Sequence, residues 1–233
     1  METDQIAGQL AGLLEATRSA ERQLFGALDP SARDAVPAGG GWSSKDVQVH
    51  VFVWKARQVE RLARAAHGQS IDPLANAEID EINAAEHDRY ADWSWDAVAA
   101  AAEEATSRLV ASIRAADFSQ PAMAALLSSS IGNGCSHPIE HLFTLPHDRV
   151  GERLLTTLEG RLADVVSSGL LPDAAAGVTI YNQACRRTLA GQFDIAREML
   201  RTAFRLNPGL VDWAPKDTDL RALWSELGSL GPQ

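Results

Sequence analysis

The stretch GWSSKDVQVHVFVW, residues 41–54, decides the fold. Serine is a preferred residue at a helix N-cap, and either Ser43 or Ser44 can fill that position. Apolar residues then recur at the three- and four-residue spacing of one helix face as far as about Ala66, and Gly68 provides a typical stop. The stretch therefore predicts a long amphipathic helix whose apolar face must be covered by other elements.

One histidine lies on the apolar face of this helix. His50 follows Val47 by three residues and precedes Trp54 by four, so the three side chains share a face. A single histidine in such a position is more often a hydrogen-bonded core residue than a ligand or a catalyst. From this stretch alone, both interpretations of His50 stay open.

The rest of the chain shows the same helical periodicity and little strand-like alternation. Gly132 and Gly134 weaken any helix that runs through them, whereas Ser136 shortly before Pro138 suits a helix start, because proline is tolerated in a first turn. The fold class is therefore predicted to be all-α, with an antiparallel four-helix bundle. Its members are expected at residues 4–28, 43–66, 94–116 and 136–149, with a shorter helix at residues 78–90.

The character of the sequence changes after the bundle, and we expect two domains, residues 1–150 and residues 151–233. The segment YNQACRRTLAGQFDIAREMLRTAFRLNP, residues 181–208, resembles one tetratricopeptide repeat (TPR), in which two helices pack through small residues. One repeat cannot bury its own apolar face, so this TPR-like domain needs further helices to pack against. The alternative is an extension specific to this fold. The small or apolar positions of the repeat fall on Ala184, Gly191, Ala196, Leu200 and Ala203.

Composition limits the classes of function. The formal net charge of −10 over 233 residues opposes binding to a phosphate backbone, so we expect no nucleic-acid partner. We find no apolar run of about 18 residues and no signal peptide, so we expect no membrane association. Cys135 and Cys185 fit neither a disulfide framework nor a paired metal motif, which indicates a reducing, cytoplasmic location.

Three of the chain's six histidines gather in fifteen residues, CSHPIEHLFTLPHDR. His137 and His141 are four residues apart, which places both imidazoles on one helix face within reach of a single ion. Together with His50 from a facing helix, they would form a three-histidine set that leaves positions open for water or substrate. Cys135 precedes the predicted helix and His147 lies about 80° around it, so neither is expected to be a ligand.

The pattern WSxKDVxxH, residues 42–50, followed after a long interval by HxxxH, residues 137–141, resembles the signature of the DinB-like four-helix-bundle superfamily. The resemblance covers about residues 5–150. Within the superfamily, EIDEIN at residues 78–83 and the following HDRYADWSWDAVAAAAEEA are similar to the branch that includes the ClbS/DfsB proteins.

This resemblance implies a divalent metal, zinc or nickel, held by His50, His137 and His141. It also implies chemistry on an electrophilic small molecule, either with a bacterial thiol such as mycothiol or bacillithiol or, in the ClbS/DfsB branch, as hydrolysis of a reactive cyclopropane in self-resistance. Whether the chain is an enzyme stays open. The alternative is a non-catalytic protein that binds a small molecule in its bundle and uses the C-terminal domain to bind a protein partner or a second copy.

We expect three residues to line the site of the small-molecule substrate. Trp54 shares the helix face of His50, Asn83 lies on the shorter predicted helix, and Tyr90 lies at the end of that helix. A capping or surface role for Asn83 is equally compatible with the sequence. Aromatic residues at this density also commonly fill a core, so the role of the two rings stays open.

Overall fold

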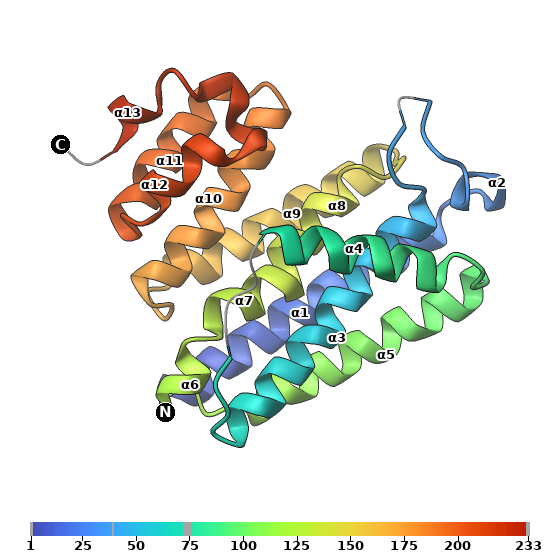
Figure 1. Cartoon of the computed structure of the whole chain (residues 1–233), viewed down its shortest axis with the longest axis horizontal. Helices are drawn as coiled ribbons and strands as arrows, with labels where there is room; N and C mark the ends of the chain where they lie inside the picture. Colours follow the sequence, from blue (N-terminus) through green and yellow to red (C-terminus); the bar gives the residue numbers. More distant parts are fainter. Residues whose placement is uncertain (1, 39, 72–75, 232–233) are drawn as a thin grey trace. The chain divides into compact units, whose positions relative to one another are not determined.

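A computed structural model describes residues 2–38, 40–71 and 76–231 of the chain (Figure 1). Every regular element in these ranges is helical, and none of them contains a β-strand. The predicted all-α fold class is therefore confirmed. No helix of the described ranges is long and apolar enough to cross a lipid bilayer.

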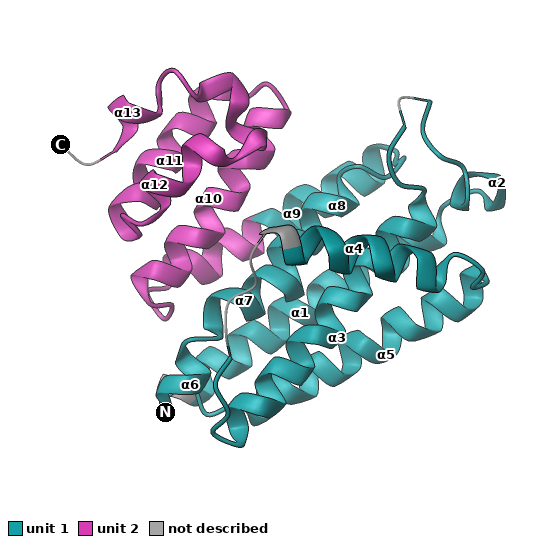
Figure 2. Cartoon of the chain, in the orientation of Figure 1, with its two compact units in different colours: residues 1–159 teal, residues 160–233 magenta. Residues whose placement is uncertain are grey.

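The chain divides into two compact units, residues 1–159 and residues 160–233 (Figure 2). The division falls inside helix α9, Arg149–Ser167, and therefore later than the boundary expected after residue 150.

Four helical members form the bundle of the first unit. They are α1 (Glu2–Gly26), α3 (Ser44–Ala66), α5 (Trp95–Ala115) and a broken segment made of α7 (Leu127–Ile131), η1 (Gly132–Ser136) and α8 (His137–Leu142). Both α1 and α3 pack against α5 and against the broken segment (Figure 1). Helices α1 and α3 are therefore diagonal partners across the core, and the predicted four-helix bundle is confirmed.

The expected antiparallel arrangement does not hold for one pair of neighbours, because α3 and α5 run in the same direction. Lys55 of α3 lies 3.2 Å from the hydroxyl of Thr106 of α5, and about two turns earlier on both helices Gln48 and Ala99 line the same cavity. Parallel neighbours need a connection that returns along the length of the bundle. Helix α4, Asn76–Tyr90, lies in this connection and packs on α3.

The start of α3 is fixed by a capping box. The Ser43 hydroxyl accepts a hydrogen bond from the Asp46 amide at 3.2 Å, and the Asp46 carboxylate accepts one from the Ser43 amide at 2.9 Å. Ser43, rather than Ser44, is therefore the N-cap. The helix ends before Gly68, whose φ of 71° lies in the left-handed region that glycine adopts readily, so the predicted stop is confirmed.

The predicted helix at residues 136–149 is wrong at both ends. The helical path begins earlier, at Leu127, and passes through the π-helical turn η1, in which the His137 amide donates to the Gly132 carbonyl. A proline ring clashes with the carbonyl four residues before it in a regular α-helix, and the wider π turn before Pro138 relieves that clash. The path then ends at Leu142, and six residues separate it from the start of α9.

A charged pair crosses the centre of the bundle. Lys55 of α3 is fully buried, and its ammonium donates to a carboxylate oxygen of Glu21 of α1 at 2.5 Å. Thr106 provides a second contact to the ammonium at 3.2 Å. Because the two charges come from the diagonal helices, the pair links the members that do not pack directly on each other. The surrounding core includes Leu10, Leu14, Leu62, Leu109, Ile113 and Ile131.

The second unit contains an antiparallel helix pair, α10 (Asp173–Leu189) and α11 (Phe193–Leu206). Gly191 lies in the turn between them with a φ of 72°, as expected for the turn glycine. The pair buries a common core that includes Ala184, Ala196, Leu200, Ala203 and Phe204.

Shorter elements complete the two units. The first unit also contains α2 (Pro30–Arg33) and α6 (Pro121–Ala124), and the second contains α12 (Leu210–Trp213), η2 (Ala214–Lys216), η3 (Thr218–Leu223) and α13 (Leu227–Leu230).

Candidate metal centre

Three imidazoles from two facing members of the bundle converge on one point. The Nε2 atoms of His50 and His137 are 2.9 Å apart, and those of His137 and His141 are 3.0 Å apart. The ligand atoms of all three lie within 4.8 Å of one another, and each residue keeps some solvent exposure. The structure thus brings together the three histidines that the sequence predicts.

The local structure explains why these three side chains meet. His50 lies in the second turn of α3, whose start is fixed by the capping box, and its face of α3 packs on α8. His137 and His141 lie one helical turn apart on α8 and so project from the same face. Pro138 and Ile139 are buried beside them, which anchors the short helix α8 in the bundle.

The surroundings keep the three imidazoles neutral. Burial, together with repulsion from His141, lowers the pKa of His50 to about 3, and burial lowers the pKa of His141 to about 4. Burial lowers the pKa of His137 well below its ordinary value, and repulsion by the other two histidines acts in the same direction. Neutral imidazole is the form that offers a lone pair to a metal ion.

The donor set fits a divalent cation. A neutral imidazole carries one N–H and one lone pair, and Nε2 of His137 contacts two other Nε2 atoms at once. This single in-plane position of Nε2 can serve only one of the two contacts, so the other lacks a good hydrogen bond. Nitrogen ligands about 2.1 Å from one ion lie about 3.0–3.4 Å apart, close to the two Nε2–Nε2 separations of 2.9 and 3.0 Å. A cation between the imidazoles would use one lone pair from each of them.

One aromatic residue of the site was not predicted as a site residue. The ring of Trp42 lies 4.4 Å from that of His50 and stacks on that of His141 at 6.0 Å, measured between ring centroids. Trp42 directly precedes the N-cap of α3, so the capping box also fixes its position. The only sequence signal for this role was its place at the start of the superfamily pattern. An indole against two of the candidate ligands shields them from water and limits their motion.

Two of the three predicted substrate residues lie at the site. The ring of Trp54 packs edge-on against His50 with centroids 6.3 Å apart, and its indole N–H donates to the side-chain oxygen of Asn83 at 3.1 Å. Asn83 also hydrogen-bonds with His50. Tyr90, two turns after Asn83 on α4, instead packs against Phe52, with centroids 5.1 Å apart.

Neither Cys135 nor His147 joins the three histidines, in agreement with the sequence-based expectation. Cys135 is buried beside Thr17, and burial raises the pKa of its thiol to about 12. Such a thiol stays protonated and does not act as a thiolate ligand. Nδ1 of His147 lies 2.7 Å from the carbonyl of Leu145, outside the group that could hold an ion.

Helix α4 leaves little room beside His50. The cavity between α3 and α4 has a volume of about 10 Å³, about enough for one water molecule. Besides Trp42, His50 and Asn83, it is lined by Glu86 of α4, which no sequence pattern marked. A substrate larger than water can reach this side of His50 only when α4 shifts away from α3.

The fold and the site define a class: an all-helical bundle in which two facing members bring together three histidines that could hold a cation. The sequence matches the DinB superfamily over residues 13–143, which is more than half of the chain. The chain therefore belongs to the DinB superfamily. A search of curated proteins gave no match, and a search of solved structures gave none either.

Proposed function

We propose that this protein binds one divalent metal ion through His50, His137 and His141 and uses it to attack an electrophilic small molecule with water or a thiol. The observation that carries the proposal is the convergence of three neutral Nε2 atoms within 4.8 Å. A bound divalent ion would supply Lewis acidity and lower the pKa of a water or thiol at its open position. Zinc and nickel are the metals we favour, since imidazole suits both.

The residues around the site have separate roles in this proposal. Trp42 and Trp54 provide apolar walls against which the carbon skeleton of a small molecule can pack. Asn83 orients Trp54 and His50 and offers an amide to a polar group of the substrate. Glu86 is a carboxylate in the same cavity and can accept the proton that the nucleophile loses.

We further propose that the reaction is a detoxification of the kind associated with the ClbS/DfsB branch, or a transfer or isomerisation that uses a bacterial thiol. The sequence similarity at residues 78–83 and 87–105 supports this branch. Asn83 of the first stretch and Glu86, which lies between the two stretches, line the cavity beside His50. The substrate is therefore expected to be a compact electrophile such as a strained ring.

Metal content tests the first part of the proposal. Protein purified without an affinity tag should contain about one divalent ion per chain by inductively coupled plasma mass spectrometry. His50→Ala, His137→Ala and His141→Ala should each lose it, because two imidazoles hold an ion far more weakly than three. His147→Ala is the matched control and should retain it, since His147 lies outside the group. A wild type that stays empty after incubation with zinc or nickel contradicts the proposal.

Turnover tests the second part. The metal-loaded protein is incubated with a small epoxide or cyclopropane, with and without a low-molecular-weight thiol, and the products are followed by mass spectrometry. Hydrolysis or thiol addition should disappear in the three variants of the triad and persist in His147→Ala. Metal binding without turnover of any electrophile would leave the metal proposal intact and contradict the enzymatic one.

A non-catalytic scaffold is the second candidate, and one observation favours it. Around the α10–α11 turn, Leu189 is 68% exposed, Ile195 is 45% exposed, and Phe193 is also exposed. Apolar side chains gathered on a surface commonly mark a protein contact. Size-exclusion chromatography with light scattering distinguishes a dimer from a monomer, and a dimer that dissociates on Leu189→Ser would support this role. This scaffold proposal includes the TPR-like character of the second unit.

A further inference from the structure

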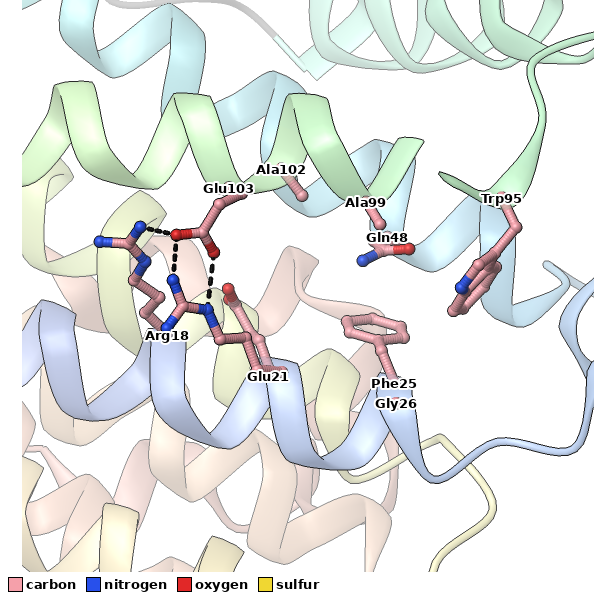
Figure 3. A pocket seen from close by; sticks show the side chains of 10 residues that line it. Arg18, Glu21, Phe25, Gly26, Gln48, Trp95, Ala99, Ala102 and Glu103 are labelled. Atoms are coloured by element: carbon pink, nitrogen blue, oxygen red, sulfur yellow. Dashed lines mark hydrogen bonds and ion pairs between the residues drawn. The ribbon is translucent and has the colours of Figure 1, made fainter. Parts of the chain in front are cut away.

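A second cavity lies between α1 and α5, with α3 as its floor (Figure 3). Its volume is about 180 Å³, and it shares no lining residue with the cavity beside His50. An apolar cavity of about 150 Å³ in another protein holds one benzene molecule, so this one is large enough for a single substituted ring. The space exists because α5 presents Ala99 and Ala102 to it, and neither side chain extends beyond Cβ.

One end of the cavity is aromatic. The rings of Phe25 and Trp95 meet edge-on with centroids 6.0 Å apart, and both face the space (Figure 3). Edge-to-face and offset contacts to such a pair favour a planar aromatic guest over a flexible aliphatic one. The size of the cavity and the aromatic side chains at this end therefore favour a ligand with one aromatic ring.

The other end carries an excess of positive charge. Arg18 and Arg22 both form ion pairs with the same carboxylate, that of Glu103. Among the described residues, the other acid that lines the cavity is Glu21, which is already paired with Lys55. The two guanidinium groups of Arg18 and Arg22 thus share one carboxylate. The pair of arginines keeps a net positive charge that can bind an anionic ligand. The planar guanidinium group of arginine can bind a carboxylate through two parallel hydrogen bonds, which also fix the orientation of the carboxylate.

Two buried polar atoms at the cavity have no hydrogen-bond partner among the described residues. They are Oε1 of Gln48 and Nε of Arg18. Gln48 is only 7% exposed, and its amide lies between α1 and α5, with Phe25 and Trp95 to one side and Glu103 to the other (Figure 3). An unpaired buried polar group is unfavourable, so its presence at a cavity points to a ligand that completes its hydrogen bonds.

We propose that this cavity is a binding site for a small aromatic carboxylate that carries a hydroxyl or amino group on its ring. The ring packs against Phe25 and Trp95, and the carboxylate binds the guanidinium groups of Arg18 and Arg22. The ring substituent donates a hydrogen bond to Oε1 of Gln48. The aromatic ring matches the size and the aromatic end of the cavity, and the carboxylate matches its excess positive charge. The ring substituent matches the unpaired acceptor.

Binding of defined probes tests this site. Isothermal titration calorimetry is carried out with 4-hydroxybenzoate, with benzoate and with 4-hydroxybenzyl alcohol, on protein stripped of metal by a chelator so that the triad cannot bind a carboxylate. We expect 4-hydroxybenzoate to bind at least tenfold more tightly than benzoate, which lacks the donor, and than the alcohol, which lacks the charge. Three probes that bind equally, or none that binds below about 10 mM, would overturn the proposal.

Variants then locate the bound probe. Ala99→Leu fills the cavity and should abolish binding, whereas Ala100→Leu, the exposed neighbour on α5, should leave it unchanged. Gln48→Leu should make 4-hydroxybenzoate and benzoate bind equally, and Arg18→Gln should weaken both acids at least tenfold. His141→Ala should bind the probe as the wild type does. Binding that survives Ala99→Leu, or that is lost in His141→Ala, shows that the probe binds elsewhere and refutes the assignment.

Discussion

At the scale of single residues, several polar side chains in the interior of the bundle have a specific partner. The Lys55–Glu21 pair is the clearest case, because it contributes one charge from each diagonal helix to the centre of the core. A buried ion pair is weak support for stability as a whole, since desolvation offsets the attraction of the charges. Removing one partner is different, because it leaves the other charge buried and unpaired.

This difference gives a prediction for the pair. Lys55→Met and Glu21→Leu should each lower the free energy of unfolding by about 3–5 kcal/mol, and the double variant should lose clearly less than the sum of the two. Urea-induced unfolding followed by circular dichroism measures these values. Arg114→Met is the control, because its ion pair with Glu15 is exposed and should contribute less than about 1 kcal/mol. Strictly additive losses would mean that the two charges do not interact.

At the scale of elements, the π turn η1 decides where α8 lies. It accommodates Pro138 and brings the chain close to α1, because a Cβ on Gly134 would lie 2.5 Å from a methyl carbon of Leu14. The neighbouring Gly132 has nothing within 4 Å of an added Cβ. The two glycines therefore have different roles. Gly134 permits a close contact between helices, whereas Gly132 lies in open space.

Exchange of each glycine for alanine separates these roles. Gly134→Ala should lower the free energy of unfolding by about 1–3 kcal/mol through overpacking against Leu14. Gly132→Ala should be neutral or slightly stabilising, because alanine loses less conformational entropy in a helix than glycine does. Thermal unfolding and metal content of both variants provide the measurement. Equal stability of the two variants would show that α1 moves away at little cost.

Helix α4 is held on the bundle more weakly than the other long helices of the first unit. No side chain within the described positions 78–90 is fully buried, so α4 gains little from apolar contact. The hydrogen bond from Trp54 to Asn83 is one of its few specific attachments to α3. Since the cavity under α4 is no larger than a water molecule, opening of α4 is expected to precede substrate entry.

Removal of that hydrogen bond should loosen α4. Trp54→Phe keeps an aromatic ring and deletes the donor, which should increase hydrogen exchange of the α4 amides severalfold, in line with a loss of about 0.5–1.5 kcal/mol. Trp93→Phe is the control, because the Trp93 ring packs against Tyr90 and phenylalanine keeps that contact. Mass spectrometry of peptic fragments gives the exchange rates. Unchanged exchange in Trp54→Phe would show that other contacts hold α4.

At the scale of the whole molecule, each of the two units has its own core. Two hydrogen bonds to Asp217 lie beside the core of the second unit. The Tyr181 hydroxyl donates to the Asp217 carboxylate at 2.8 Å, and the Trp224 indole donates to the Asp217 carbonyl at 2.9 Å. The candidate metal centre lies entirely in the first unit. A ligand stabilises only the part of a protein that must be folded to bind it.

Metal binding should therefore protect one unit and not the other. Addition of zinc or nickel at about 100 times its dissociation constant should slow hydrogen exchange in α3 and α8, with a gain of about 2.7 kcal/mol, and leave α10 and α11 unchanged. Phe204→Ala is the complementary variant: it should speed exchange in α10 and α11 without a change in metal content, because Phe204 belongs to the second core. Equal protection of both units would indicate that they unfold together.

Much of the fold and the site follows from the sequence alone, because the signals are local. Serine followed three residues later by Asp46 specifies the start of α3, and the spacing of His137 and His141 places both on one face. The helical periodicity and the match of residues 13–143 lead to the same bundle. These features depend on a few neighbouring residues, which is why a linear pattern reveals them.

Only the tertiary structure decided the features that depend on distant neighbours. The glycines before Pro138 suggested a helix start, but packing of Gly134 against Leu14 keeps the chain helical through a π turn. The place of Trp42 over two ligands and the displacement of Tyr90 from the site likewise depend on how α3, α4 and α8 meet. Local propensity determined where most helices form, and close packing between helices determined which side chains share a site.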